Sequence, residues 1–330
     1  MAAILKRGDY QWQATIRKKG YPTQCKTFET KRDAEDWSKT VESEMRRGLF
    51  IDRTEAERTS FADALARYAE QVTPGKKGRV RELNRIACLQ KQAFSLRSLA
   101  SLRAKDFAAY RDMRSKSVSA NTVRLELALI SHVFTVAKTE WNISIDNPIS
   151  AIRKPKLPPG RDRRFKAGEE MRLMAAITCN SLRLAVQLSL GTGMREGELV
   201  GLTWDQIDFN DKIVQLSDTK NGSNRIVPMT EAVEALLKSV IAALPCPPDP
   251  NERLLRYPNA YVLCSAFISA RKNAGLENFT FHDLRHEAAS IFAPKMEVAT
   301  LAKVFGWKTL QMAMRYYHPS PKDLVAAVRL

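Results

Sequence analysis

The chain has 330 residues, which is enough for two or three domains that each bury a core of their own. It carries 53 Lys and Arg against 36 Asp and Glu, a formal net charge of +17 that is spread along the whole sequence. This balance favours nucleic acid as the partner, because phosphate neutralisation by basic side chains supplies most of the sequence-independent affinity. An anionic membrane surface fits less well, and no stretch approaches 18 consecutive apolar residues.

The start of the chain and its cysteines indicate the compartment. Residues 1–10 lack the long apolar segment of a signal peptide, which predicts a soluble, cytoplasmic protein. With nucleic acid as the expected partner, that protein would be nucleoid-associated. The cysteines are odd in number and widely spaced, with no C-x-x-C pair: Cys25, Cys88, Cys179, Cys246 and Cys264. We expect reduced thiols, because this spacing disfavours both a disulfide framework and a cysteine zinc site.

The first predicted domain, residues 1–56, combines a small sheet with one helix. Residues 10–17 alternate between apolar and polar side chains as a half-buried strand does, and a second strand is predicted around 25–28. From Lys31 the apolar residues take helical spacing until Gly48 ends the helix. A basic ribbon of two or three strands can enter a groove of DNA, although a solvated basic face has the same charge pattern. The predicted DNA contacts in this domain are Arg17, Lys18 and Lys19.

The second predicted domain, residues 57–152, is helical. Its clearest helix carries an apolar stripe at i, i+4, i+7, i+11 and i+14, which predicts a side that faces the core. The stripe consists of Val123, Leu127, Ile130, Phe134 and Ala137. His132 lies one residue off this line and is interpreted as a surface or packing histidine.

A basic segment rich in proline, residues 153–164 (RKPKLPPGRDRR), follows the helical domain. Its prolines and glycine disfavour helix and strand, so we predict an extended linker between two domains. The charge suits contact with a phosphate backbone, while a merely solvated linker is the alternative. The predicted DNA contacts here are Arg153, Lys154 and Lys156.

The last predicted domain, residues 165–330, has a mixed α+β pattern that begins with helices around 169–178 and 181–190. The glycines of TGMREG (192–197) then break one helical run and begin another. This places Arg195 at a turn with its guanidinium free. A planar fork of donors can grip two phosphate oxygens at once, although a surface arginine in a turn between helices is the plainer alternative.

A hairpin is predicted next, because two apolar runs flank the sequence TKNG (219–222) and Asn-Gly is a strong hairpin-turn signal. Lys220 would lie at the exposed tip, where it could swing into a groove of DNA. A lysine at such a tip is usually just solvated, so this feature is informative only together with the others.

The sequence HDLRH (282–286) places His282, Arg285 and His286 within one turn of a predicted helix. The buried side of that helix is expected to consist of Leu284, Ala288, Ile291 and Phe292. Two histidines four residues apart also resemble a zinc-binding helix. We disfavour that interpretation, because the chain has only four histidines and Arg285 would place a positive charge beside the metal. An anion site without a metal is predicted instead.

The last motif is GWK (306–308), which is followed nine residues after Trp307 by Tyr316. A phenol near a helix end is a nucleophile only when its anion is stabilised, and clustered arginines can do this. For a single tyrosine considered alone, a packed aromatic ring is the more common role.

Taken in order, Arg, Lys, H-x-x-R, Trp or His, and Tyr at these spacings resemble the catalytic domain of tyrosine recombinases and phage integrases. The resemblance is tight from Arg163 to His318. Upstream it is looser: residues 60–150 look like the helical core-binding domain of the family, and residues 1–50 look like its small arm-binding domain. The stretch 121–164 is also similar to shufflon-type DNA invertases.

The resemblance implies a role for each matching residue. Tyr316 would be the nucleophile, and Arg195 and Arg285 would clamp the scissile phosphate. Lys220 would protonate the departing 5′ hydroxyl. Together these residues imply strand cleavage through a 3′-phosphotyrosyl intermediate, with no cofactor and no external energy source.

The remaining site residues are assigned supporting roles by the same resemblance. His282 would bind a non-bridging oxygen and assist proton transfer, while Trp307 would donate its indole N–H to the phosphate. Because indole is a donor only, Trp307 cannot move protons, which leaves the acid–base work to His282 and Lys220. Glu198 and His286 are expected to orient the arginines.

Tyr317 directly follows Tyr316 and could be mistaken for the nucleophile. On a helix the two side chains point about 100° apart, so only one of them can face the phosphate. The nine-residue spacing from Trp307 and the Tyr-x-His step to His318 both select Tyr316. Tyr317 and His318 are interpreted as packing residues.

The resemblance also implies double-stranded DNA as the partner, a homotetramer on two duplexes, and accessory DNA-bending and excisionase proteins. The expected activity is integration and excision of a prophage or other mobile element, with DNA inversion as the alternative. A type IB topoisomerase is disfavoured by the basic amino-terminal module, and a relaxase by the lack of a His-hydrophobe-His motif in the sequence. A non-catalytic DNA-binding regulator is disfavoured because every chemical position is filled.

Overall fold

The computed structural model describes residues 2–216, 225–317, 325 and 328–329. The chain divides into two compact units, Met1–Pro159 and Gly160–Leu330. The division falls inside the segment predicted as a linker, 153–164. The described residues are mainly helical with small antiparallel sheets, which confirms the predicted fold class.

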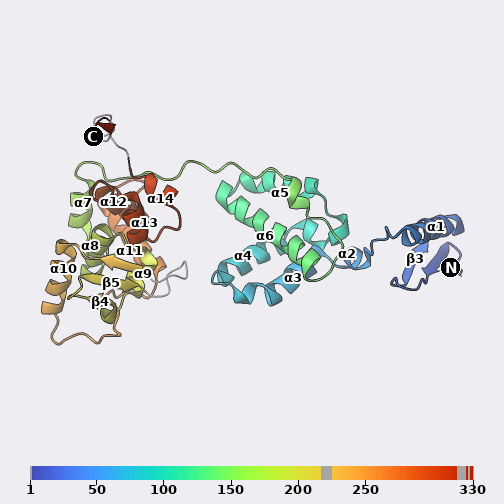
Figure 1. Cartoon of the computed structure of the whole chain (residues 1–330), viewed down its shortest axis with the longest axis horizontal. Helices are drawn as coiled ribbons and strands as arrows, with labels where there is room; N and C mark the ends of the chain where they lie inside the picture. Colours follow the sequence, from blue (N-terminus) through green and yellow to red (C-terminus); the bar gives the residue numbers. More distant parts are fainter. Residues whose placement is uncertain (1, 217–224, 318–324, 326–327, 330) are drawn as a thin grey trace. The chain divides into compact units, whose positions relative to one another are not determined.

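The first unit begins with a three-stranded antiparallel sheet in the order β1-β2-β3, formed by Ala2–Gly8, Gln11–Ile16 and Gln24–Phe28. Helix α1, Lys31–Arg47, packs against β2 (Figure 1). It ends at Gly48, whose φ of 68° is the left-handed conformation that glycine adopts without strain. Both predicted strands and the predicted helix are therefore present.

The first strand, β1, was not predicted. It is an edge strand whose side chains are mostly exposed, and Leu5 is 55% exposed although it is apolar. An alternating pattern arises only where one face of a strand is buried. The sequence of β1 therefore carries no such signal.

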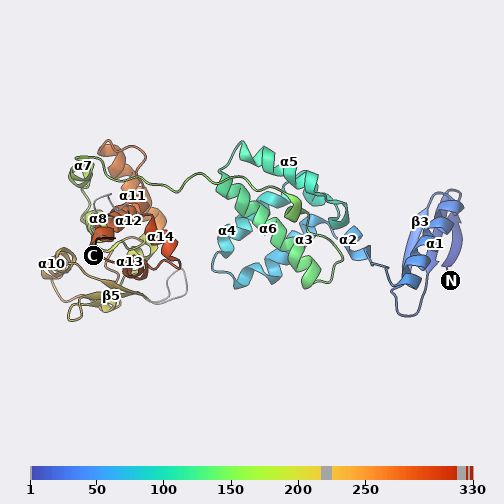
Figure 2. The same cartoon turned by 45° about the horizontal axis from the view of Figure 1, so that its top comes forward.

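The rest of the first unit is helical. Its helices are α2 Thr54–Arg58, α3 Phe61–Gln71, α4 Arg79–Gln90, α5 Ala104–Ser115 and α6 Ala120–Thr139. Helix α6 runs through the middle of this group, with α5 on one side and α3 on the other (Figures 1 and 2). All five residues of the predicted apolar stripe on α6 are buried, which confirms that side as core. His132 on α6 is exposed at the surface of the helix, with its Nδ1 hydrogen-bonded to the hydroxyl of Tyr68.

The second unit is mainly helical and contains a second small sheet. Its helices are α7 Glu169–Ala176, α8 Asn180–Thr192, α9 Glu196–Gly201, α10 Glu231–Ala242, α11 Ala260–Asn273, α12 Phe281–Phe292, α13 Val298–Phe305 and α14 Leu310–Met314. The sheet has the order β4-β5-β6, formed by Ile207–Asp208, Ile213–Leu216 and Arg225–Pro228. The antiparallel pairing of β5 with β6 confirms the predicted hairpin. The predicted tip, with Lys220, lies outside the described residues.

Helix α12 carries the predicted HDLRH residues and packs against α8. Leu284 and Ala288 are fully buried as expected, whereas Ile291 is 42% exposed and Phe292 is half-buried. The expectation for Ile291 was wrong. Helical spacing predicts which side of a helix faces the core, but it does not predict how far along the helix neighbouring elements bury that side. The buried half of α12 is the half that carries the site.

Candidate active site

Arg195 lies in the turn between α8 and α9, as its flanking glycines predict. Gly193 ends α8 with a φ of 63°, and a Cβ at this position would overlap the ring of Phe305. The predicted free guanidinium is wrong, because the arginine is held from two sides. Its Nη1 donates to Oε1 of Glu198 at 2.7 Å, and its Nη2 donates to the carbonyl of Gly306 at 3.2 Å.

Glu198 is shared between two arginines. Its second oxygen, Oε2, accepts from the backbone N–H of Arg195 at 2.9 Å and from Nη2 of Arg225 at 2.6 Å. Burial alone would raise the pKa of the Glu198 carboxyl, but Arg225 and Arg195 hold it below its usual range. Glu198 is therefore a carboxylate placed between Arg195 and Arg225.

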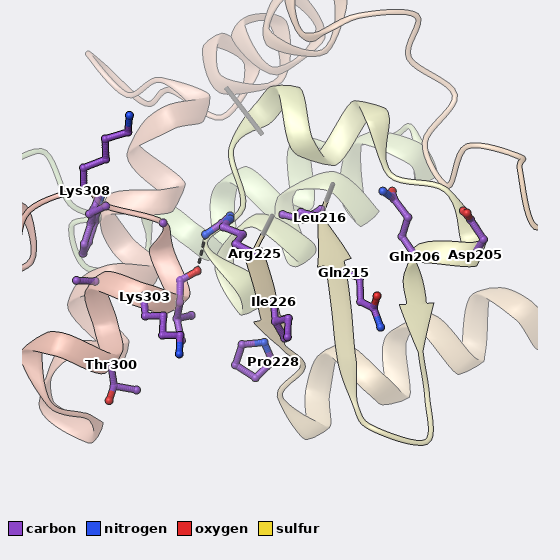
Figure 3. Close-up of a pocket in the computed structure, with 14 residues that line it drawn as sticks. Asp205, Gln206, Gln215, Leu216, Arg225, Ile226, Pro228, Thr300, Lys303 and Lys308 are labelled. Atoms are coloured by element: carbon purple, nitrogen blue, oxygen red, sulfur yellow. Dashed lines mark hydrogen bonds between the residues drawn. The ribbon is translucent and has the colours of Figure 1, made fainter. Parts of the chain in front are cut away.

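Arg225 is a site residue that was not predicted. Its side chain is only 6% exposed, and it points from the start of β6 toward α13, where Nη1 donates to the carbonyl of Val304 (Figure 3). The missed signal was strand alternation. Arg225 lies on the same face of β6 as buried Val227, and a charged residue on the buried face of a strand needs a buried partner.

Arg285 lies on the buried side of α12 and is 4% exposed. It donates hydrogen bonds to the carbonyls of Gly193 and Phe305. The guanidinium carbon lies 5.0 Å from the ring centroid of Phe305 and 5.6 Å from that of Trp307, distances that favour cation–π attraction. The motif arginine is thus fixed between the end of α8 and the end of α13.

These three arginines form a cluster with one carboxylate, Glu198, among them. Burial, followed by repulsion from Arg195 and Arg225, lowers the pKa of Arg285 to about 9, so it still carries its charge at neutral pH. An excess of positive charge in a partly dry site is a strong attraction for an anion.

A cavity of about 1140 Å³ adjoins the cluster, between the β5–β6 pair and α13 (Figure 3). Arg225 and Trp307 border it, and its other polar lining side chains include Gln206, Gln215, Lys303 and Lys308. Amide and ammonium groups of this kind donate hydrogen bonds to phosphate oxygens. The cavity therefore places further hydrogen-bond donors beside the arginine cluster.

His282 lies on the exposed side of α12, with 48% of its side chain accessible. Its Nδ1 is 3.3 Å from Oε2 of Glu196, a pairing that was not predicted. The imidazole lowers the pKa of the Glu196 carboxyl to about 2. His282 is thus oriented by an acid at the start of α9, and its ring centroid lies 5.3 Å from that of His286.

Tyr316 and Tyr317 lie just after α14 and not on it, so the helical argument that separated them was wrong. Their hydroxyls nevertheless point to different partners. The Tyr317 hydroxyl donates to the carbonyl of Met296 at 2.5 Å, whereas the Tyr316 hydroxyl is hydrogen-bonded to Nδ1 of His286. Tyr317 is thereby tied to the segment before α13.

The Tyr316 ring stacks on the indole of Trp307, with centroids 5.3 Å apart and planes 6° apart. Burial raises the pKa of the Tyr316 phenol, and Arg315 and Arg285 act in the opposite direction. His286 was expected to orient the arginines, but the structure places it against this phenol instead. The predicted tyrosine, tryptophan and HDLRH motifs therefore meet at one place.

The predicted DNA contacts of the first unit lie on its surface. Arg17 and Lys19 are exposed in the turn after β2, and Lys18 lies 5.2 Å from the ring centroid of Tyr21. Arg153, Lys154 and Lys156 are exposed near the end of the unit. Their positions are those that contact with an external anion requires.

The second half of the predicted linker is bound to the second unit by ion pairs. Arg161 pairs with Asp283 at 2.6 Å, and Arg164 pairs with Glu287 at 2.7 Å. Both carboxylates lie on α12, next to the histidines of the HDLRH motif. Arg163 pairs with Glu169 on α7 at 2.7 Å. These arginines already neutralise carboxylates of the second unit.

The part of the chain that the structure describes contains neither a metal-binding cluster nor a membrane-spanning helix. No group of three or more His, Cys, Asp or Glu side chains in this part of the chain could hold a metal ion. None of the helices within the described ranges is both long and apolar enough to cross a lipid bilayer.

Comparison with known proteins identifies the family. A sequence model described as the phage integrase family matches residues 163–323. The shufflon-specific DNA recombinase of Escherichia coli is 34% identical over 279 residues, which cover 81% of this chain and 71% of that protein. The integrase of Salmonella phage P22 is 27% identical over 229 residues, which cover 66% of this chain and 58% of the phage protein.

Solved structures share the fold. A lambda integrase dimer bound to a core site has a TM-score of 0.67 at 21% identity, covering 95% of this chain and 93% of that one. A lambda integrase tetramer bound to a Holliday junction has a TM-score of 0.66 at 20% identity, covering 93% and 95%. The chain therefore belongs to the phage integrase family and is a tyrosine recombinase.

Proposed function

We propose that this chain recombines double-stranded DNA at specific sites, with Tyr316 as the nucleophile. The Tyr316 oxygen would bond to the scissile phosphorus while the bond from phosphorus to the 5′ oxygen breaks. The phenol proton passes to a base, and the departing 5′ oxygen takes up a proton. Attack by the 5′ hydroxyl of another strand reverses these changes, so the bond energy is kept in the 3′-phosphotyrosyl link.

The observation that carries this proposal is the cluster of three arginines around one carboxylate, beside the only described tyrosine whose hydroxyl faces the HDLRH motif. Arg195 and Arg285 would clamp the scissile phosphate and stabilise the charge that grows on its oxygens. Arg225 would act through Glu198, which it shares with Arg195. This arrangement concentrates donors where a phosphorane would form.

The other site residues complete the chemistry. His282 would bind a non-bridging oxygen and assist proton transfer, and its exposure leaves room for DNA to approach. Trp307 would donate its indole N–H to the phosphate. Lys220, in the segment between β5 and β6, would protonate the departing 5′ oxygen, because an ammonium is a ready proton donor.

We further propose that four copies act on two duplexes, as in the lambda integrase tetramer on a Holliday junction. Residues 1–56 would bind DNA through the turn after β2, and residues 57–152 would bind the core site. The basic residues 153–156 would follow the phosphate backbone. DNA-bending and excisionase proteins would assist as accessory factors.

Integration and excision of a mobile element is the first candidate reaction, and the integrase of phage P22 supports it. Inversion is the second candidate, because the shufflon-specific recombinase matches a larger share of the chain at higher identity. DNA from both flanks of the gene, cloned in direct and in inverted orientation on one plasmid, separates them. Deletion between direct repeats without inversion between inverted repeats favours excision. Inversion between inverted repeats favours the second candidate.

The test of the nucleophile uses nicked duplexes tiled across the DNA that flanks the gene, so that the cleaved fragment diffuses away and the adduct accumulates. Tyr316→Phe is expected to form no covalent adduct while it still shifts the same duplexes in a gel. Tyr317→Phe is the matched control, since it removes the neighbouring hydroxyl and should still form adducts. Adducts that persist in Tyr316→Phe would reject the assignment.

A further inference from the structure

The hydroxyl of Tyr316 has one hydrogen-bond partner among the described side chains, Nδ1 of His286. The two rings stack with centroids 5.9 Å apart and planes at 30°. The Tyr316 ring also packs against Trp307, to which it lies nearly parallel. The phenol is therefore held in position by a ring stack, with its hydroxyl against an imidazole nitrogen.

We propose that His286 is the general base that takes the proton of Tyr316 as the phenol oxygen attacks the scissile phosphate. This inference rests on the proposed function, because it assigns the proton acceptor of that same reaction. In the step, the Tyr316 O–H bond breaks as its oxygen bonds to phosphorus, and the proton moves to Nδ1 of His286. The electron pair released from the phosphorus–oxygen bond stays on the departing 5′ oxygen, which is protonated separately.

His286 has the protonation state that this step requires. It is half-buried on α12, and burial, followed by repulsion from His282, lowers the pKa of the imidazole to about 4. The ring is thus neutral at neutral pH. To accept from the phenol at Nδ1 it carries its proton at Nε2.

The charges around His286 explain when the transfer occurs. His282, Asp283 and Arg285 belong to its own helix, and Arg315 lies in the turn after α14. Asp283 raises the pKa of His286, whereas His282, Arg285 and Arg315 lower it. A bound phosphate adds negative charge that offsets the arginines and so raises the proton affinity of His286. Transfer is therefore coupled to DNA binding and to attack, and the free enzyme keeps a protonated phenol.

The two histidines of the motif also differ in their surroundings. His282 faces Glu196 and is open to solvent, whereas His286 faces the nucleophile and is half-buried. The geometry divides the proton work between them: His286 serves the attacking oxygen, and His282 is free to serve the phosphate.

The test compares cleavage of the nicked duplexes by wild type, His286→Asn and His286→Phe across pH. The asparagine amide can still hydrogen-bond the phenol, and the phenylalanine ring can still stack on it, but neither takes a proton. Loss of a general base is expected to slow adduct formation at neutral pH by about 10²-fold or more. The deficit should shrink as pH rises, because phenolate then forms without a base.

A second measurement separates base catalysis from positioning. Fluorinated tyrosine at position 316 has a more acidic phenol, so it should speed cleavage in His286→Asn far more than in wild type. His132→Asn is the matched control, because it removes the other described Tyr–His hydrogen bond and should leave the pH profile unchanged. An equal loss at every pH, or no gain from the fluorinated phenol, would overturn the inference.

The two proposals fail in different ways. If wild type forms no adduct that depends on Tyr316, the proposed function is wrong. If wild type forms that adduct and His286→Asn forms it at the same rate with the same pH dependence, only the role of His286 is wrong.

Discussion

Replacing Glu198 with Gln removes the carboxylate that Arg195 and Arg225 share. The Glu198 side chain is 9% exposed and that of Arg225 is 6% exposed, so the substitution leaves a guanidinium buried without its counter-charge. Breaking a buried ion pair from one side costs about 3–5 kcal/mol. Gln keeps one acceptor and Arg195 is 21% exposed, so we expect the lower end, about 3 kcal/mol of unfolding free energy.

The assay is hydrogen exchange of peptides from α8, α9 and α12 in the full chain, which reports the opening free energy of the second unit separately from the first. Glu234→Gln is the matched control. Its carboxylate also pairs with two basic side chains, Lys212 and Lys238, but they lie at the surface, and no change in exchange is expected. If Glu198→Gln exchanges like the wild type, the shared carboxylate does not hold the arginines.

The cost of Glu198→Gln should also depend on pH. The pKa of Glu198 in the folded chain lies below its ordinary value of 4.5. Its contribution to stability is therefore complete above that value and is lost as the pH falls through the folded pKa. The difference between wild type and Glu198→Gln should accordingly shrink in acid.

Three further predictions concern chemistry and DNA contact. Trp307→His should retain adduct formation on the nicked duplexes, because imidazole also donates an N–H; complete loss would mean that the stack on Tyr316 is indispensable. Lys220→Ala should slow cleavage by about 10²-fold or more, and a 5′-bridging sulfur in the DNA should restore it, since a thiolate leaves without a proton. Arg153→Ala should lower the slope of log DNA affinity against log salt concentration by the contribution of about one phosphate contact, whereas Arg164→Ala should leave that slope unchanged.

Local patterns were enough to predict the elements that carry the site. The turn at Arg195 follows from the glycines on either side, and the helix over HDLRH follows from its apolar spacing. The β5–β6 hairpin follows from Asn-Gly between apolar runs. Each of these signals comes from residues within a few positions of one another.

Partners far apart in the sequence could not be predicted in the same way. Arg225 reaches Glu198 across 27 positions, and His286 reaches Tyr316 across 30. Neither distance leaves a periodic trace in the sequence, because the contact depends on how α12 packs on α8 and how α13 packs on β6. The resemblance to the family supplied the list of chemical residues but not the pairing among them.

Charge is the clearest case of this difference. The predicted linker was interpreted as one basic segment, yet Arg161, Arg163 and Arg164 each pair with a carboxylate of the second unit. Asp283, the partner of Arg161, is fully buried, so its ion pair is part of the fold. A basic side chain that already neutralises a carboxylate releases no counterion from DNA. The formal charge of +17 already subtracts every carboxylate, so these pairs do not change its size. They decide only where the positive charge lies, which in this segment is before Gly160.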